Sequence, residues 1–292
     1  MLVSFNQLLA DARAGGYAVG YFEAWDLYSL EAVAEAAEAE NAPVILGIGG
    51  VMMDEGWFDG GGLERLAAAG LATAQGARVP TAFILNEVAT FSQIMRGLRA
   101  GFNAVMLDST ALPYAEHARL TRQVVQAAHP IGVAVEAELG ALPDGSGELG
   151  GEVGHMTDPD EAARFVAETG VDALAVSVGN IHILLEGQSP FDRPRLAALR
   201  RAVSIPLVLH GGSGFPDAAI PDALALGVAK VNFGSALKRA FLAGLVEGVG
   251  ALPERVSYHQ AVGSRKPGDV LQQGKDRLRA EISRRIRLWH PQ

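Results

Sequence analysis

The sequence predicts a (β/α)8 barrel with an additional C-terminal helix. Eight short apolar segments alternate with alanine-rich segments of helical period, and 292 residues suffice for eight such units. Most apolar segments are nearly continuous, which is typical of parallel strands buried on both faces. The alternative is an open doubly wound sheet. The barrel is favoured because no early Gly-x-Gly-x-x-Gly turn is present and polar residues recur where many strands end.

The predicted elements follow one another without a domain boundary. The strands are expected at 18–24, 43–48, 80–86, 104–108, 132–138, 172–178, 206–210 and 228–233, and helical patterns include 30–40, 63–75, 115–127 and 159–168. The last pattern starts clearly, because Thr157 or Asp158 can cap it and Pro159 suits its first turn. An amphipathic pattern at 269–288 predicts the C-terminal helix, which packs on the barrel or on a partner subunit. We therefore expect a single domain over 1–292.

The composition argues against several classes of protein. The net charge of −9 opposes a general nucleic-acid binder, which needs a basic face, although a local site can still bind a small anion. The absence of cysteine excludes disulfides and thiolate metal sites. The first residues show no signal-peptide pattern, and no stretch approaches the ~18 apolar residues of a membrane span. We expect a cytoplasmic protein with no nucleic-acid or membrane partner.

Polar residues follow many of the predicted strands, where the catalytic groups of a barrel lie. They are Glu23, Asp26, Asn86, Glu87, Asp108, Ser109, Glu136, Glu138, His182, His210, Asn232 and Ser235. Such a ring indicates a site, because buried polar groups must be paired. His182 and His210 end neighbouring strands, and neutral imidazole is a common ligand of zinc. They predict a metal site, with backbone hydrogen bonding of each histidine as the alternative.

Two turns of small residues predict an anion site beside the metal site. Gly211-Gly212-Ser213-Gly214 follows the seventh strand, and Asn232-Phe233-Gly234-Ser235 follows the eighth. Phosphate-binding loops of such barrels usually occur there. Small residues let backbone N–H groups approach an anion, and a helix N-terminus adds a favourable dipole. The alternative is ordinary helix capping by Ser213 and Ser235.

Carboxylates offer further chemistry. Glu136 and Glu138 lie on the same face of the fifth strand, where they can bind a metal, exchange protons or pair with arginines. Glu152 lies in a glycine-rich loop at 145–154. It is either a solvated charge or the carboxylate of a mobile lid.

Five segments occur in order along the chain: VEAELG at 135–140, HMTDP at 155–159, VGNIH at 178–182, LHGGS at 209–213 and KVNFGS at 230–235. Together they resemble the class II, zinc-dependent ketose-bisphosphate aldolases, which include the fructose- and tagatose-bisphosphate enzymes. The resemblance runs from Tyr17 to the segment at Asn232. It implies a (β/α)8 barrel, a phosphorylated sugar as substrate and a homo-oligomer, dimer or larger. In this family zinc polarises the ketose carbonyl and stabilises the enediolate left when the C3–C4 bond breaks.

The resemblance also implies roles for single residues. His182 and His210 match two zinc-binding histidines, and Asp108 and Glu138 match carboxylates near the metal or a second ion. Glu152 loosely matches a loop glutamate that handles a proton. Substrate- or phosphate-binding positions match Gly179, Gly211, Gly212, Ser213, Asn232 and Ser235.

Four residues depart from the family's pattern. The family has an aspartate and a zinc-binding histidine at the end of the third strand, where this chain has Asn86 and Glu87. Its asparagine at the end of the first strand is Glu23 here, and its glycine after the second histidine motif is Ile183. Asparagine cannot exchange a proton near neutral pH. Glu87 can complete a set of two histidines and one carboxylate, which admits manganese or iron besides zinc.

These residues predict a metal-dependent lyase of the aldolase family that acts on a phosphorylated ketose or a related sugar acid. Its metal ligands are Glu87, His182 and His210. Its catalytic candidates are Glu23, Asn86, Glu138 and Glu152, and one of the three glutamates replaces the lost aspartate as proton carrier.

Two alternatives remain open at the level of the sequence. One is a metal-dependent sugar-phosphate epimerase or isomerase, with Glu23 and Glu138 as its two proton carriers. The other is a non-catalytic sugar-phosphate binder, which the loss of the aspartate motivates. Retention of both histidines and several carboxylates favours an enzyme.

Overall fold

The computed structural model describes residues 1–145, 154–184 and 186–291, and its centre is a closed barrel of eight parallel strands. The strands follow chain order around the barrel, and the last also pairs with the first. They are β1 (Val19–Glu23), β2 (Val44–Gly49), β3 (Thr81–Val88), β4 (Ala104–Leu107), β5 (Ala134–Leu139), β6 (Ala173–Val176), β7 (Leu207–Leu209) and β8 (Val228–Phe233). Every strand residue except Glu87 is buried. The predicted barrel is confirmed.

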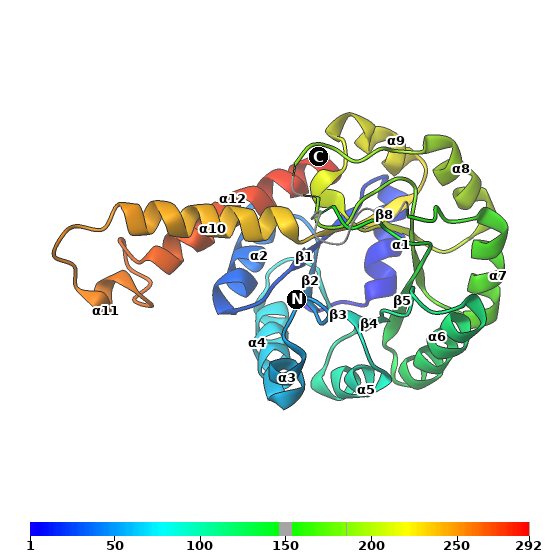
Figure 1. Cartoon of the computed structure of the whole chain (residues 1–292), viewed down its shortest axis with the longest axis horizontal. Coiled ribbons are helices and arrows are strands. Elements are labelled where there is room, and N and C mark those ends of the chain that lie inside the picture. The colour runs from blue at the N-terminus through cyan, green and yellow to red at the C-terminus, as the bar shows by residue number, and fades with distance from the viewer. Residues whose placement is uncertain (146–153, 185, 292) are drawn as a thin grey trace.

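Helices surround the barrel between successive strands (Figure 1). They are α2 (Leu27–Ala39), α3 (Glu55–Trp57), α4 (Leu63–Gly76), α5 (Phe91–Ala100), α6 (Tyr114–Ala128), α7 (Pro159–Thr169), α8 (Arg193–Ala202), α9 (Ile220–Ala225) and α10 (Ser235–Gly250). The start of α7 resolves the choice of cap. Asp158 accepts hydrogen bonds from the N–H groups of Asp160 and Glu161, whereas Thr157 donates its hydroxyl to the Leu139 carbonyl.

A helix before the first strand, α1 (Phe5–Gly15), closes the amino-terminal end of the barrel. Its buried residues Phe5, Leu8, Leu9 and Ala12 pack against the side chains that fill the barrel interior. The carboxyl ends of the strands are left for a site, as is usual in this fold.

The C-terminal part of the chain forms an arm. Helix α10 and helix α12 (Val270–Trp289) run side by side away from the barrel, with the short α11 (Tyr258–Ala261) near the far end (Figure 1). The predicted C-terminal helix is thus confirmed as α12. This helix also packs on the barrel, where the N–H of Ala18 donates to the Trp289 carbonyl over 2.9 Å.

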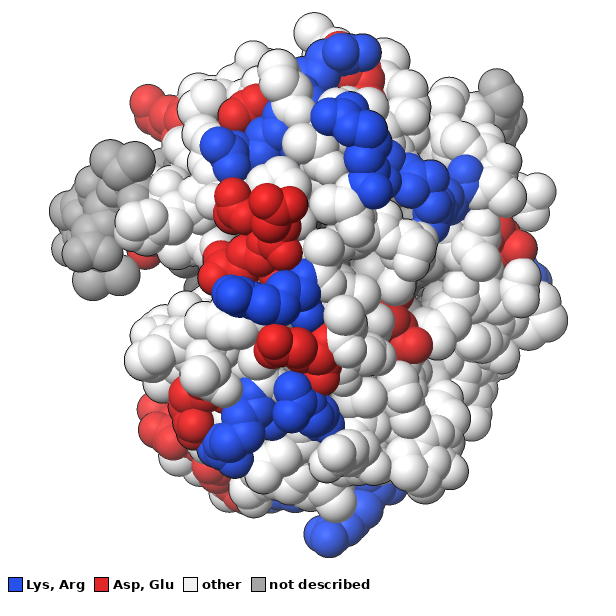
Figure 2. Space-filling model, turned by 90° about the vertical axis from the view of Figure 1, so that its right-hand side faces the viewer, with Lys and Arg blue, Asp and Glu red and all other residues white. Residues whose placement is uncertain are grey.

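Charged side chains of both signs share the surface over α6, α7 and α8. Figure 2 shows lysine and arginine interleaved with aspartate and glutamate on this face rather than gathered in one basic area. A nucleic-acid backbone would need such an area. Within the described ranges, no helix has both the length and the apolar character needed to cross a membrane.

Candidate metal centre and anion site

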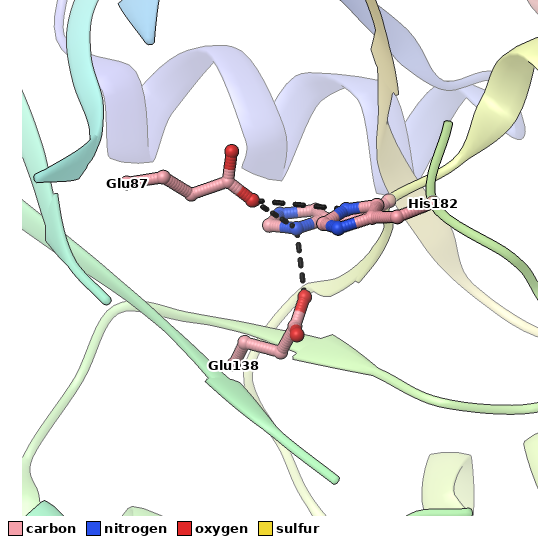
Figure 3. A group of neighbouring side chains, drawn as sticks. Glu87, Glu138 and His182 are labelled. Carbon is pink, nitrogen blue, oxygen red and sulfur yellow. Dashed lines mark ion pairs between the residues drawn. The ribbon is translucent and has the colours of Figure 1, made fainter. Parts of the chain in front are cut away.

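Four side chains from four strand ends converge at the carboxyl end of the barrel. Glu87, Glu138, His182 and His210 each place one nitrogen or oxygen atom within 4.8 Å of the others. The Nδ1 of His210 lies 2.7 Å from a carboxylate oxygen of Glu138 and 3.1 Å from one of Glu87. The Nε2 of His182 lies 3.7 Å from the same Glu87 oxygen. Figure 3 shows both carboxylates directed at two nearly parallel imidazole rings.

The buried atoms of this cluster fit a cation. The Nδ1 of His210 and the Oε2 of Glu138 are both buried, yet neither has a hydrogen-bond partner of good geometry although they lie only 2.7 Å apart. Orphaned buried polar atoms are costly unless an ion or a water satisfies them. Two imidazoles and two carboxylates are also the ligand types that zinc, manganese and iron accept.

Glu136 and Lys230 lie behind His210 and hold its other nitrogen. The Nε2 of His210 is 3.0 Å from a Glu136 oxygen, which also accepts a hydrogen bond of 2.8 Å from the Lys230 ammonium. A carboxylate in this position fixes the orientation of a metal-binding histidine. Burial alone would raise the pKa of Glu136, but Lys230 and His210 lower it below the usual range.

The charges of the cluster do not balance without a cation. Three carboxylates, of Glu87, Glu136 and Glu138, face one lysine, Lys230, so two negative charges remain when His210 is neutral. Buried surplus charge of this kind is strongly unfavourable. In the cation-free protein the carboxylates outweigh the effect of burial and raise the pKa of His210 well above its usual value. A divalent cation would neutralise the same surplus.

Glu87 reaches the cluster through an unusual backbone conformation. Its φ is +50°, and the register of β3 against β4 shifts between Leu85 and Val88. Residues other than glycine rarely adopt this region, and such outliers gather at functional sites. Burial would raise the pKa of Glu87, but the nearby His210 and His182 lower it to about 2.

Backbone hydrogen bonds fix the position of His182. Its N–H donates to the Pro143 carbonyl over 3.0 Å, and its carbonyl accepts from the Gly145 N–H over 2.7 Å. The next residue, Ile183, has a φ of +50°. A β-branched side chain is disfavoured in this conformation, and the expected residue there was glycine.

A cavity of about 340 Å³ opens beside the cluster. Its walls include Glu23, Glu87, Asp108 and His182, together with the apolar side chains of Val51, Met52, Ile181, Ile183, Leu184 and Phe233. Glu23 lies at the end of β1 and pairs with the ammonium of Lys238, at the start of α10, over 2.8 Å. Burial raises the pKa of Glu23, although Lys238 opposes the shift.

The predicted anion turns line the same cavity. Gly211, Ser213, Asn232 and Ser235 all face it. The hydroxyl of Ser213 accepts a hydrogen bond of 3.2 Å from the Ala236 N–H, which joins the turn after β7 to the first turn of α10. Ser213 thus occupies one N–H of the first turn of α10, as the capping alternative expected, and Gly234 and Ser235 at the start of this 16-residue helix line the cavity.

Three of the remaining predicted residues, Gly179, Gly212 and Asn86, do not line the cavity. Gly212 is buried under the turn, and Gly179 has a φ of +99° with the Pro190 carbonyl where a Cβ would be, so both positions satisfy backbone requirements. Asn86 is buried, and its Oδ1 has no hydrogen-bond partner among the described residues. Glu152 lies outside the described residues.

Three contributing residues have no role in the sequence-based predictions. Lys230 could have been found, because a lysine within an apolar strand is rarely buried without a partner. Lys238 is followed directly by Arg239, and Arg285 of α12 has several basic neighbours on its helix, so nothing in the sequence distinguishes either residue.

The fold and the order of its strand-end motifs define an aldolase-type barrel. The chain belongs to the class II fructose-bisphosphate aldolase family, whose model matches residues 3–292. It is 36% identical over 288 residues to a fructose-bisphosphate aldolase of Thermus caldophilus, covering 90% of this chain and 92% of that protein. A fructose-bisphosphate aldolase of Geobacillus stearothermophilus is 33% identical over 289 residues, covering 98% and 96%.

A solved structure agrees with this assignment. The YdjI aldolase of Escherichia coli K12 superposes with a TM-score of 0.81 and 30% identity, covering 99% of this chain and 98% of that one. The family resemblance expected from the motifs is therefore confirmed, and the activity class that it supports is an aldolase-type lyase. Class II aldolases use a divalent metal, for which the cluster at Glu87 and His210 is a candidate centre.

Proposed function

We propose that this protein is a metal-dependent aldolase-type lyase that cleaves or forms a carbon–carbon bond in a phosphorylated ketose or a related sugar acid. The observation that carries the proposal is one cavity lined by residues of two kinds. Glu87 and His182 of the histidine–carboxylate cluster line it, and so do the turns suited to a phosphate group.

Glu87, His182 and His210 would hold the metal, with Glu138 as a fourth ligand. Zinc is our first choice, and the two carboxylates also admit manganese or iron. Once bound, a divalent cation supplies polarisation of the substrate carbonyl and stabilisation of the negative charge that develops on it. Glu136 and Lys230 would keep the His210 ring in place.

Glu23 is the best-supported proton carrier. It lines the cavity and has a raised pKa, which suits a group that must both accept and return a proton. Glu138 is held against His210 instead. In cleavage, Glu23 would take the proton from the C4 hydroxyl as the C3–C4 bond breaks and the C4 carbonyl forms. Lys238 would stabilise its ionised form.

The amide groups of Gly211, Ser213 and Ser235 would bind the phosphate, assisted by the N-terminus of α10. Asn232 is held by the Lys230 ammonium over 2.6 Å and would orient a substrate hydroxyl. Asn86 would not exchange a proton, because an amide does not ionise near neutral pH.

The test is cleavage of a panel of ketose mono- and bisphosphates by protein loaded with Zn²⁺, Mn²⁺ or Fe²⁺. We expect release of an aldehyde from at least one substrate, loss of release after chelation and recovery when the metal returns. Solvent deuterium in recovered substrate without cleavage would instead indicate an epimerase or isomerase. Phosphate-dependent thermal stabilisation without any turnover would indicate a binder.

We further propose that residues 1–292 act as one domain in a cytoplasmic homo-oligomer. The arm supports the assembly, because it exposes the apolar side chains of Leu242, Val246, Val249, Tyr258 and Val262, and the first three share one face of α10. A second copy could cover this face across a twofold axis. Val246→Glu is expected to lower the mass measured by light scattering to that of a monomer, whereas Arg255→Glu on the connecting loop should not.

A further inference from the structure

Arg285 of α12 reaches the anion turn from behind. Its side chain is buried, with 6% exposed, which is rare for an arginine. One terminal nitrogen donates to the Gly212 carbonyl and the other to the Ser213 carbonyl, each over 3.3 Å. Its Nε donates to Glu281, one helical turn earlier, over 2.7 Å. Three hydrogen bonds therefore fix this guanidinium in one orientation.

The two carbonyl contacts determine which way the turn faces. In a trans peptide the C=O and the following N–H point in opposite directions, and the described peptides include no cis bond. Because the Gly212 carbonyl is directed at Arg285, the Ser213 N–H is directed away from it. Ser213 lines the cavity, and its hydroxyl is held by the Ala236 N–H. The N–H and the hydroxyl of Ser213 are therefore both fixed in direction.

Arg285 also places a full positive charge behind the turn. Its guanidinium lies 5.4 Å from the ring centre of Phe233, which forms part of the cavity wall. Glu281 partly balances the charge, because its carboxylate is shared between Arg285 and the exposed Arg284. A buried cation polarises the two peptide groups that it contacts, which strengthens their N–H groups as donors.

We propose that Arg285 is a positioning residue for phosphate binding: by holding the carbonyls of Gly212 and Ser213, it aims the turn after β7 at the phosphate group of the substrate. The inference rests on the proposed function, in which this turn binds phosphate. It makes α12 part of the anion site although no atom of α12 lines the cavity.

The test compares Arg285→Met and Arg285→Lys with the control Arg284→Met. Arg284 pairs with the same glutamate but makes no described contact with the turn. Binding of inorganic phosphate to the metal-loaded protein is measured by calorimetry, together with the thermal midpoint and the metal Kd. We expect the phosphate Kd to rise about tenfold in Arg285→Met. It should rise severalfold in Arg285→Lys, because lysine keeps the positive charge but cannot hydrogen-bond both carbonyls as the planar guanidinium does. Arg284→Met should bind phosphate as the wild type does.

A second readout separates positioning from general stability. With a phosphorylated substrate, Arg285→Lys should raise KM while kcat and the metal Kd stay within about twofold of wild type. Unchanged phosphate binding in a folded Arg285→Lys protein would overturn the inference and leave the proposed function intact. Lower kcat and weaker metal binding at constant KM would also overturn it. A wild-type protein that does not bind phosphate would overturn the phosphate site itself.

Discussion

The two halves of the cavity rim differ in how closely they follow the family pattern. Strands β5 to β8 supply Glu138, His182, His210 and the phosphate-type turns, all at positions that match the resemblance. Strands β1 and β3 supply Glu23, Asn86 and Glu87, none of which does. Both halves nevertheless meet in one cluster, because Glu87 lies 3.1 Å from the Nδ1 of His210.

Under the proposed function, this difference separates ligand binding from proton transfer. The half that matches would bind the metal and the phosphate, and its supporting contacts are in place, including the Glu136–Lys230 pair behind His210. The half that departs contains the groups nearest to proton transfer. We infer that this member keeps the ligand sites of its family and moves protons with a different carboxylate.

The largest effect is expected in the half that matches. His210→Ala would remove a buried metal ligand with both ring nitrogens engaged, so we expect lyase activity to fall by at least about a thousandfold. His129→Ala is the control, because His129 also pairs with a carboxylate, that of Asp172, far from the cavity. Activity retained by His210→Ala in chelator-free assays would place the metal elsewhere.

Glu23→Gln tests the half that departs. Loss of the proposed proton carrier should lower kcat about a hundredfold and leave the metal Kd unchanged. Since burial raises the folded-state pKa of Glu23, its active ionised form is lost as pH falls through that raised value. The acidic limb of the wild-type pH profile should therefore lie above the usual range of a glutamate and disappear in Glu23→Gln. An acidic limb that persists in Glu23→Gln would show that another group carries the proton.

Glu87→Gln tests whether Glu87, in the half that departs, binds the same metal as the histidines of the half that matches. The amide keeps the size of the side chain but removes its charge, so we expect the metal Kd to rise at least about tenfold with a smaller change in kcat. Glu64→Gln, an exposed carboxylate paired with Arg96, serves as the matched control. Equal metal affinity in both variants would show that Glu87 is not a metal ligand. The ligands would then come only from the half that matches.

The smallest effect concerns the one departure in the matching half. Ile183 adopts a φ of +50°, so Ile183→Gly should relieve strain worth about 1 kcal/mol, which the greater freedom of the unfolded chain partly offsets. The thermal midpoint should stay level or rise slightly. Ile181→Gly, at a position without positive φ, should lower it. A fall in both variants would show that the Ile183 side chain stabilises the wall of the cavity.

Prediction from the sequence succeeds where the signal is local. Nearly continuous apolar segments are buried on both faces in all eight strands, and the cap at Asp158 is confirmed because its partners lie within three residues. The pairing of Lys230 with Glu136 joins residues 94 positions apart, so only the closed barrel reveals it. Likewise the contact of Arg285 with the anion turn depends on how α12 docks. The positive φ of Gly179 is likewise visible only in the structure, and its predicted role in substrate binding stays a prediction.

The hydrogen bond between Ala18 and the Trp289 carbonyl has a consequence for synthesis of the chain. Strand β1 pairs with β8, and Ala18, the residue just before β1, is hydrogen-bonded to the end of α12. A ribosome must therefore release β8 before the barrel can close. Until then the edge of β1 that pairs with β8 is exposed. Chaperones would shield such an unpaired strand edge from aggregation.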